Sequence, residues 1–398
     1  MTPASFDVDV IVAGAGVGGA ALALALAQKY PLRILVAERR SGPGNVNRGD
    51  SLLPAVTAHF AAWNALDRLV AAGARSISSM QVFHHRRGMI MEARLETSTH
   101  PYLVLPHADI ERVLAEAAVA TSRVEICYNR RVTSLIEEGN RVCGAMIANG
   151  TGSPEPVRAR LVVGADGSSS SLREQLGISF PRTPYNHSFF VIEFERPPQY
   201  HDAMRVELHP AGGMLVVPGH DRVGIAALVR KDEEAIFRQG TIEEKASRLR
   251  RRSPLLAESR EFPKSAHLYS LARAHADRYT ARGAVLLGDA VHVTNPTAGQ
   301  GMTMALEDAA ALASHAGPAL AAGEAGDLLD SRLVAYERER MSRNAKALRW
   351  SHWMSRFYAL GPPFGDAMVR AVFAFGGSSL GASMRRRVWS QVAVREGI

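Results

Sequence analysis

The sequence predicts an α/β fold in which a parallel-sheet unit is interrupted by an inserted antiparallel β-sheet and followed by a helical C-terminal segment. Three observations predict it. A strand, glycine turn, helix and strand open the chain, and alternating apolar runs replace this pattern from about Pro181 to Tyr279. A buried strand of the parallel type, "GAVLLGD", then returns at Gly283. The first predicted domain is discontinuous and comprises residues 1–79, 102–180 and 280–345. The inserted β-rich domain comprises residues 80–101 and 181–279, and the helical segment residues 346–398.

The individual elements follow in order along the chain. Residues 7–14 and 33–39 read as strands around a helix over 15–30, and Pro31 marks the return from helix to strand. Apolar periodicity predicts further helices over residues 54–73, 107–121 and 241–251, and a long one from about Gly301. The inserted domain reads as antiparallel strands with one exposed face.

Composition narrows the class of protein. The 398 residues suffice for two domains, and contents of 46% apolar and 22% charged residues are typical of globular proteins. Cys127 and Cys143 lack the spacing of redox or metal-binding pairs, so we expect thiols in a reducing compartment, the cytoplasm. No signal-peptide pattern or membrane-spanning apolar run is apparent. The net charge is +8, but no aromatic–basic module accompanies the arginine runs at 248–253 and 384–389, so we do not expect nucleic-acid binding.

The first chemical motif is "GAGVGG", in which Gly14, Gly16 and Gly19 have GxGxxG spacing between a strand and a helix. Such glycines permit a tight turn and a close approach to a pyrophosphate at the helix N-terminus. Glu38 closes the second strand, where a carboxylate can accept hydrogen bonds from a ribose diol. The motif predicts a dinucleotide site, and the alternative is a tight packing turn.

Two further segments combine a strand end with glycines or a helix start. In "LLGDAVHVTNPTAGQGMTMALEDA" (286–309), a strand delivers Asp289, Pro296 stiffens a loop, and Gly299 and Gly301 precede a helix whose N-terminus would stabilise negative charge. In "GADGSSSSLR" (164–173), Asp166 and Gly167 turn the chain and a serine caps the next helix, which carries Arg173. Either segment alone could be only a turn.

Together the three motifs resemble the single-component FAD-dependent monooxygenases related to para-hydroxybenzoate hydroxylase, a group that includes ubiquinone-pathway and alkylquinolone-pathway hydroxylases. The likeness covers residues 7–345. It implies a Rossmann-like FAD-binding domain with an inserted β-sheet substrate domain. It also implies that FAD, reduced by NAD(P)H, reacts with O2 to give a flavin C4a-hydroperoxide that hydroxylates a small aromatic or quinone-like substrate.

The resemblance implies roles for individual residues. Gly14, Gly16 and Gly19 would hold the FAD pyrophosphate. Glu38 would bind the adenosine ribose, and the next residue, Arg39, would also contact the cofactor. Asp289 would bind the ribityl or pyrophosphate region. The flavin ring would be lined by Pro296, Gly299, Gln300, Gly301 and Met302. Arg48 would contact the cofactor, and Asp166, Gly167 and Arg173 would serve FAD and NAD(P)H.

This sequence departs from the family at His107, where an arginine is common. His107 could hydrogen-bond a phosphate, or Arg112 could supply the missing charge. We assign no catalytic base, because Tyr185, His187, His209 and His220 have no partner visible in the sequence and are interpreted as structural or solvent-facing. No second nucleotide fingerprint indicates the electron donor.

Three alternatives stay open. The same scaffold serves flavin-dependent halogenases and prenyl-chain reductases, although "RWSHW" (349–353) does not match the spacing of the halogenase tryptophan signature. A non-catalytic FAD-binding protein is the third. Residues 349–364 mix tryptophan, arginine and phenylalanine as interfacial segments do, but we favour a C-terminal helix packed on the FAD domain over membrane association.

Overall fold

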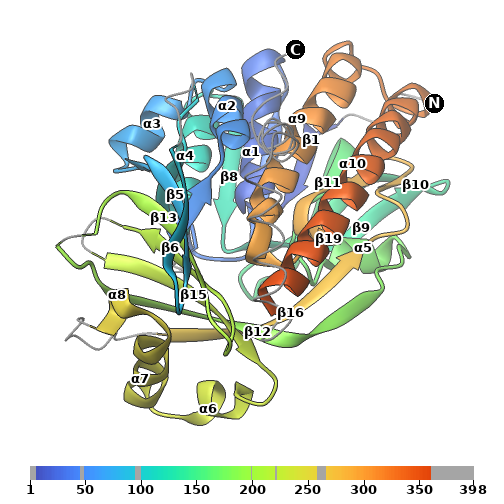
Figure 1. Ribbon diagram of the computed structural model, residues 1–398. Coiled ribbons are helices and arrows are strands. Elements are labelled where there is room, and N and C mark those ends of the chain that lie inside the picture. The colour runs from blue at the N-terminus through green and yellow to red at the C-terminus, as the bar shows by residue number, and fades with distance from the viewer. Residues whose placement is uncertain are drawn as a thin grey trace.

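The computed structural model describes residues 6–44, 49–94, 100–198, 200–219, 222–257 and 266–359 (Figure 1). Its first sheet has a parallel core in the order β18–β11–β1–β2–β8, to which β17 and the hairpin β9–β10 add antiparallel strands. The bounds are β1 Val8–Ala13, β2 Ile34–Glu38, β8 Val124–Tyr128, β9 Arg130–Glu138, β10 Arg141–Asn149, β11 Glu155–Gly164, β17 Thr280–Ala281 and β18 Ala284–Leu286.

The parallel strands end together at one edge of this sheet. Ala13 lies in register with both Ala37 and Gly164, and Gly164 is in register with Leu286. The carboxyl ends of β1, β2, β11 and β18 therefore meet, and this is the edge at which open α/β sheets bind ligands. The motifs predicted from the sequence all follow these strand ends.

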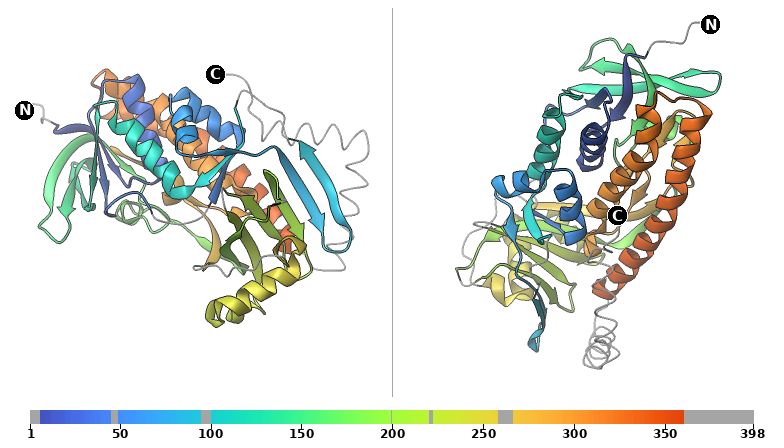
Figure 2. Two further views of the ribbon diagram at one scale, coloured as in Figure 1. Left: turned by 90° about the vertical axis from the view of Figure 1, so that its left-hand side faces the viewer. Right: turned by 90° about the horizontal axis from the view of Figure 1, so that it is seen from above.

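Helices cover the first sheet. Helix α1 packs against both α4 and α9, and α10 runs along α9 (Figure 2). Their bounds are α1 Val17–Lys29, α4 His107–Val119, α9 Gln300–Ala321 and α10 Asp327–Ala359. The helix predicted over 54–73 is instead two, α2 Pro54–Ala62 and α3 Leu66–Ala71, because Asn64 adopts a left-handed φ of 49° between them.

The second sheet has the order β19–β16–β12–β15–β14–β13–β5–β6. Its bounds are β5 Ser79–His84, β6 Gly88–Arg94, β12 Arg182–Glu195, β13 Ala203–Leu208, β14 Met214–Pro218, β15 Arg222–Arg230, β16 Ala266–His275 and β19 His292–Val293. The predicted antiparallel arrangement is confirmed with one exception, since β13 pairs with β5 in parallel. A small sheet, β3 Gly49–Leu52, β7 Leu103–Pro106 and β4 Arg75–Ser76, completes the strands.

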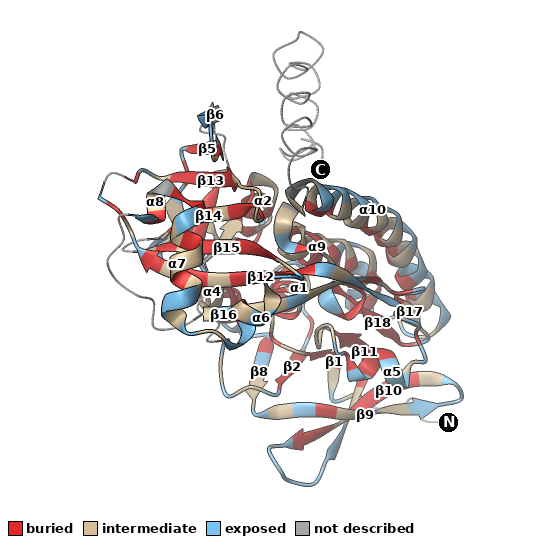
Figure 3. Cartoon of the chain, turned by 60° about the horizontal axis from the view of Figure 1, so that its bottom comes forward, coloured by how far each residue is buried: buried red, intermediate tan, exposed pale blue. Residues whose placement is uncertain are grey.

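The two faces of the second sheet differ in what covers them. Phe190, Ile192 and Phe194 of β12 are buried against a cluster that includes residues of α6 Glu234–Gln239, α7 Ile242–Arg252 and α8 Pro254–Ala257. These helices lie on the side away from α1 and α9 (Figures 1 and 3). The alternate residues of β12 face the first domain. The α/β class, with a parallel-sheet unit and an inserted, mainly antiparallel sheet, is thus confirmed, while the domain boundaries stay a prediction.

Candidate functional site

The glycine turn after β1 has no room for larger residues. Gly14 has φ +103°, and a Cβ there would lie 2.4 Å from the carbonyl oxygen of Ala165. A Cβ on Gly19 would lie 2.0 Å from the carbonyl oxygen of Gly14. A Cβ on Gly16 would lie 3.7 Å from Oε1 of Glu111, an ordinary contact, so Gly16 is less crowded than Gly14 and Gly19; it lies at the N-terminus of α1, which has no side-chain cap. The turn therefore fits a pyrophosphate on the helix N-terminus.

Glu38 lies buried at the end of β2 beside this turn. Its Oε2 accepts a hydrogen bond from the Ala15 amide at 2.7 Å, and its Oε1 accepts from the Arg40 amide and Nε at 2.9 and 3.0 Å. Burial alone would raise the pKa of Glu38, but the hydrogen bonds from Arg40 and Ala15 outweigh it and lower the pKa. Glu38 is thus an ionised acceptor, as a ribose-binding residue must be. Arg39 is exposed, and Arg40 is the arginine that contacts Glu38.

His107 begins α4 between two carboxylates. Its Nδ1 contacts Asp50, and its Nε2 lies 3.4 Å from Oε1 of Glu111. Glu111 also accepts from the Gly44 amide and from Arg40 at 2.7 and 3.0 Å. Burial opposes ionisation of Glu111, yet the hydrogen bonds from His107, Gly44 and Arg40 lower its pKa to about 2. His107 therefore belongs to a network of carboxylates and Arg40, and a contact from it to a phosphate stays a prediction.

Other predicted basic residues take different positions. Arg112 does not substitute for His107, because its guanidinium pairs with Asp109 and Glu116 on its own helix. Arg48 lies outside the described residues. Among the titratable residues of this region, the sequence interpretation missed Asp50, Arg40 and Glu111. The spacing of His107 and Glu111, one helical turn apart, was the available signal.

Asp166 and Arg173 organise the turn after β11. One carboxylate oxygen of Asp166 accepts from the Leu172 amide at 3.2 Å, while Oδ1 is buried and accepts no hydrogen bond from a described residue. Ser170 caps α5 (Ser171–Gln175) by accepting from the Arg173 amide, as predicted. The Arg173 guanidinium is buried 4.0 Å from the Phe180 ring and donates to the Ala290 carbonyl at 2.9 Å. Arg173 therefore ties this turn to the segment that follows β18.

That segment presents Asp289 and a second helix N-terminus. Gly288 has φ +62°, and the 3-10 turn Gly288–Ala290 leaves Asp289 exposed toward a cavity. A second 3-10 turn, Pro296–Ala298, leads to Gly299, which has φ +61° and precedes α9. No side chain caps α9, and Gly299, Gly301 and Met302 line the same cavity. Backbone amides at this position can face a ring system that carries negative charge.

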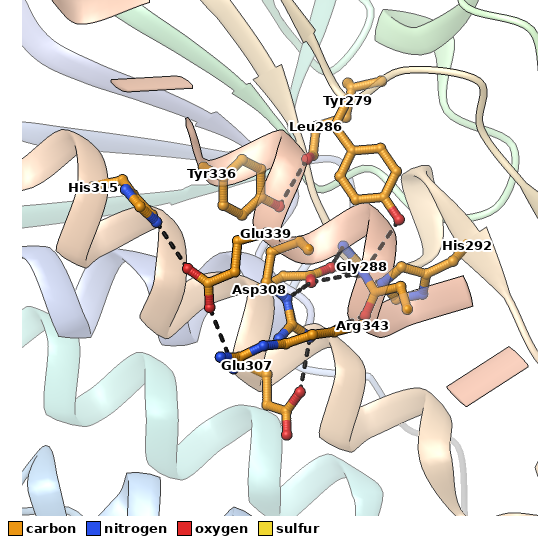
Figure 4. Close-up of polar contacts among 12 residues, drawn as sticks. Tyr279, Leu286, Gly288, His292, Glu307, Asp308, His315, Tyr336, Glu339 and Arg343 are labelled. Atoms are coloured by element: carbon orange, nitrogen blue, oxygen red, sulfur yellow. Dashed lines mark hydrogen bonds and ion pairs between the residues drawn. The ribbon is translucent and has the colours of Figure 1, made fainter. Parts of the chain in front are cut away.

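A buried ionic network contacts the turn that carries Asp289. Figure 4 shows this network around Gly288 and Asp308. Asp308 of α9 accepts from the Gly288 amide at 3.1 Å, and Nε2 of His292 lies 2.7 Å from its Oδ2. Its other oxygen accepts from Arg340 of α10 at 2.7 Å. The Tyr336 hydroxyl donates to the Leu286 carbonyl at 3.2 Å. These contacts fix the position of the Gly288–Asp289 turn relative to α9 and α10.

A cavity of about 520 Å³ joins these parts. One side of the cavity is lined by the three predicted motifs and by the group around His107. These residues are Gly16, Val17, Asp50, His107, Glu111, Gly167, Asp289, Gly299, Gly301 and Met302. The second sheet lines the other through Phe189, Val191, Glu193, Leu215, Val217 and Tyr269. The cavity therefore brings cofactor-type backbone cradles against a mainly apolar surface, as small-molecule sites do.

Tyr185, His187 and His209 do not line this cavity. Tyr185 lies against His352. His187 is buried, and its Nε2 accepts a hydrogen bond from the side-chain Nδ2 of Asn295 at 3.2 Å. Burial and the neighbouring His85 lower the pKa of His209 to about 4. His220 lies outside the described residues. Burial raises the pKa of both cysteines, of which Cys143 is buried and Cys127 half-buried.

The described part of the chain has no helix that is both long and apolar enough to cross a membrane. Trp350 and Trp353 stack with ring centres 5.6 Å apart and are exposed near the end of α10.

Comparison with known proteins agrees with this geometry. A family model described as an FAD binding domain matches residues 7–351. Rifampicin monooxygenase of Streptomyces venezuelae is 28% identical over 289 residues, which cover 70% of this chain and 57% of the relative. The 3-demethoxyubiquinol 3-hydroxylase of Escherichia coli is 31% identical over 214 residues, or 52% of this chain and 51% of the relative. The chain thus spans a little more than half the length of these relatives.

Among solved structures, PqsL of Pseudomonas aeruginosa in complex with 2-aminobenzoylacetate has a TM-score of 0.78 at 26% identity, covering 88% of this chain and 96% of that one. The cradles of Gly14, Gly16 and Gly19, the ionised Glu38 and the glycines before α9 fit FAD. The chain belongs to the family that this family model describes, that of an FAD binding domain, and its resemblance to the single-component flavin monooxygenases related to para-hydroxybenzoate hydroxylase is confirmed.

Proposed function

We propose that this protein is an FAD-dependent monooxygenase that hydroxylates a small aromatic or quinone-like substrate, with O2 as the oxygen source and NAD(P)H as the electron donor. The observation that carries the proposal is the shared cavity, because both glycine-rich helix starts and the apolar sheet face open into it. Relatives named as a monooxygenase and a hydroxylase support an oxygen-transfer reaction. The free thiols favour a reducing compartment, for which we propose the cytoplasm.

The chain's own residues bind, orient and exclude water. The N-terminus of α1 with Gly14, Gly16 and Gly19 holds the pyrophosphate, and Glu38 accepts from the ribose. Asp289 holds the ribityl region, and the start of α9 from Gly299 to Met302, with Pro296, lines the ring. Bound FAD supplies the oxygen-activating redox chemistry. The apolar residues of the second sheet hold the substrate and keep water away from the reacting atoms.

Asp166, Gly167 and Arg173 are our proposed link between the flavin site and NAD(P)H. Gly167 lines the cavity, whereas Arg173 is buried and shapes the turn through the Ala290 carbonyl. We therefore assign Arg173 a positioning role toward the cofactor segments. Its replacement should change the KM for NAD(P)H and FAD occupancy together.

The test is substrate-dependent incorporation of isotopically labelled dioxygen. FAD-loaded protein is screened with NADH and with NADPH against phenols, aromatic amines and quinols, and products of any stimulated oxidation are examined for the label. Labelled product supports the proposal. Halide incorporation would identify a halogenase. Saturation of a prenyl chain without incorporation of the label would identify a reductase. The absence of oxygen transfer with every reductant would refute the monooxygenase.

A further inference from the structure

Among the residues of β12 that line the cavity, Glu193 is the one carboxylate, and it follows the apolar Phe189 and Val191 along the same face. Glu193 lies in register with Gly224 of β15, which lies in register with Val217 of β14, so these three form one row across the sheet. The next row holds Val191, Ala226 and Leu215. All six residues line the cavity. An acidic side chain at this place needs a physical reason, because burial of an ionised group among apolar neighbours is unfavourable.

No tight internal partner explains Glu193. Its ionic neighbour is Arg222, whose Nε lies 3.9 Å from Oε2, beyond hydrogen-bond range. The side chains of Glu193 and Arg222 are 26% and 43% exposed, so their interaction is a loose surface pair. Within the described chain, no hydrogen bond joins the Glu193 carboxylate to another residue. Burial raises the pKa of Glu193 despite Arg222.

Space for a ligand group lies beside the carboxylate. Gly224 stands opposite Glu193, and a Cβ at Gly224 would meet only the Val217 carbonyl oxygen, 3.8 Å away, among the described atoms. The row therefore has a hollow next to the acid, where a polar substituent of a ring could sit. The other polar side chain that this sheet face presents to the cavity is uncharged, Tyr269 of β16.

The charge of the whole lining is acidic. Among the described residues that line the cavity, Asp50, Glu111, Glu193 and Asp289 are acidic, and His107 is the basic one. His107 sits between Asp50 and Glu111. Neither lysine nor arginine occurs among these lining residues. An anionic substituent on the substrate would thus meet a carboxylate in the second sheet, and the arginine near it, Arg222, is already loosely paired with Glu193 and does not line the cavity.

We propose that Glu193 is a specificity-determining residue that accepts a hydrogen bond from a hydroxyl or amino group on an apolar aromatic substrate and rejects aromatic carboxylates. This proposal deepens the function proposed above and rests on it for the reaction, but not for binding. Gly224 is the complementary feature, because its missing side chain leaves room for the donor group. The apolar neighbours hold the ring.

The test uses three probes with one ring system: 1-naphthol, 1-naphthylamine and 1-naphthoate. Calorimetric titration of the purified protein, with and without FAD, measures binding without requiring turnover. We expect naphthol and naphthylamine to bind the wild-type protein at least roughly ten-fold more tightly than naphthoate. Glu193→Leu should weaken the two donors by roughly ten-fold or more, while Glu193→Gln should improve naphthoate binding.

Two further variants separate this role from general damage. Glu195→Gln removes an exposed acid of the same strand that does not line the cavity, and should leave all three affinities unchanged. Gly224→Val fills the hollow and should weaken the donors more than Glu195→Gln does. Equal affinity for the three probes, no measurable binding of the two donors, or unchanged donor affinities in Glu193→Leu would overturn the proposal. Failure of oxygen transfer with these affinities intact would count against the monooxygenase alone.

Discussion

Replacing Asp308 by asparagine should destabilise the protein strongly, because this carboxylate is the centre of a fully buried ionic network. Asp308 is 0% exposed and Arg340 is 1% exposed. Arg340 Nε and Asn344 Nδ2 donate to its Oδ1 at 2.7 and 3.0 Å. His292 and the Gly288 amide contact its Oδ2 at 2.7 and 3.1 Å. The substitution removes the charge and leaves Arg340 buried.

The structure sets the size of the effect. Burial alone would raise the pKa of Asp308, but His292, Arg340 and Asn344 outweigh it and lower the pKa from 3.8 to about 2, which corresponds to about 2 kcal/mol. Breaking a buried pair costs about 3–5 kcal/mol in total, and because Arg340 keeps Glu307 as a partner at 2.8 Å, we expect the lower end of this range. With a urea m-value near 3 kcal/mol/M, the unfolding midpoint should fall by about 1 M or more.

The assay is urea unfolding followed by far-ultraviolet circular dichroism. Asp327→Asn on α10 is the matched control, since Asp327 is 90% exposed and pairs with the exposed Arg282, and it should change the free energy of unfolding by less than about 1 kcal/mol. The double variant Asp308→Asn/Arg340→Met should be less destabilised than the sum of the single variants. A midpoint shift for Asp308→Asn no larger than that for Asp327→Asn would refute the reasoning.

The same network predicts a pH dependence with a defined sign. Because the folded pKa of Asp308 lies below its usual 3.8, its contribution to stability is complete above about pH 5 and is lost as the pH falls toward 2. The part that arises from this pKa difference should fall to about half by pH 3. The gap between the midpoints of wild type and Asp308→Asn should therefore narrow from pH 7 to pH 3, and a constant gap would contradict the assigned cause.

Three further outcomes are expected. Gly19→Ala should abolish FAD binding and lower the melting temperature, because its Cβ would lie 2.0 Å from the Gly14 carbonyl oxygen, while Gly42→Ala, with no described atom within 4 Å, should change neither. Asp289→Ala should weaken FAD by roughly ten-fold or more in a fluorescence titration, and unchanged occupancy would remove this carboxylate from the site. Glu111→Gln should lower the urea midpoint at pH 7 but less at pH 3, since the folded pKa of Glu111 is lowered to about 2 and its contribution disappears as the pH falls through that value.

Local signals in the sequence were sufficient for the glycine turn and for the helix cap. Gly14 and Gly19 are required by contacts within one turn and its neighbouring strand, so spacing alone could predict them. Ser170 caps α5 for the same local reason. The break at Asn64 was missed because apolar periodicity continues through it, although φ there is 49°.

Residues whose role depends on distant partners could not be predicted. Asp308 and Arg340 lie on separate helices, and nothing in either helix indicates that the two meet in the interior. The sequence does not single out Glu193, because an acid in an alternating strand is usually on the solvent face. Only the pairing of β12 with β15, and of β15 with β14, places it in the cavity beside Gly224. Strand register is therefore the missing information.

Asn295 links the two halves of the cavity. Its side-chain Oδ1 caps the turn before α9 by accepting from the Thr297 backbone amide at 3.0 Å, and its side-chain Nδ2 donates to Nε2 of His187 in β12 at 3.2 Å. Its carbonyl accepts from Ser351 of α10 at 2.6 Å. The loop that begins α9 is thus held to the second sheet by a buried residue with a partner on each side. Because buried polar groups keep their hydrogen-bond partners, Asn295 ties the position of this loop to that of β12. The position of the apolar wall and the position of the α9 N-terminus are consequently set together.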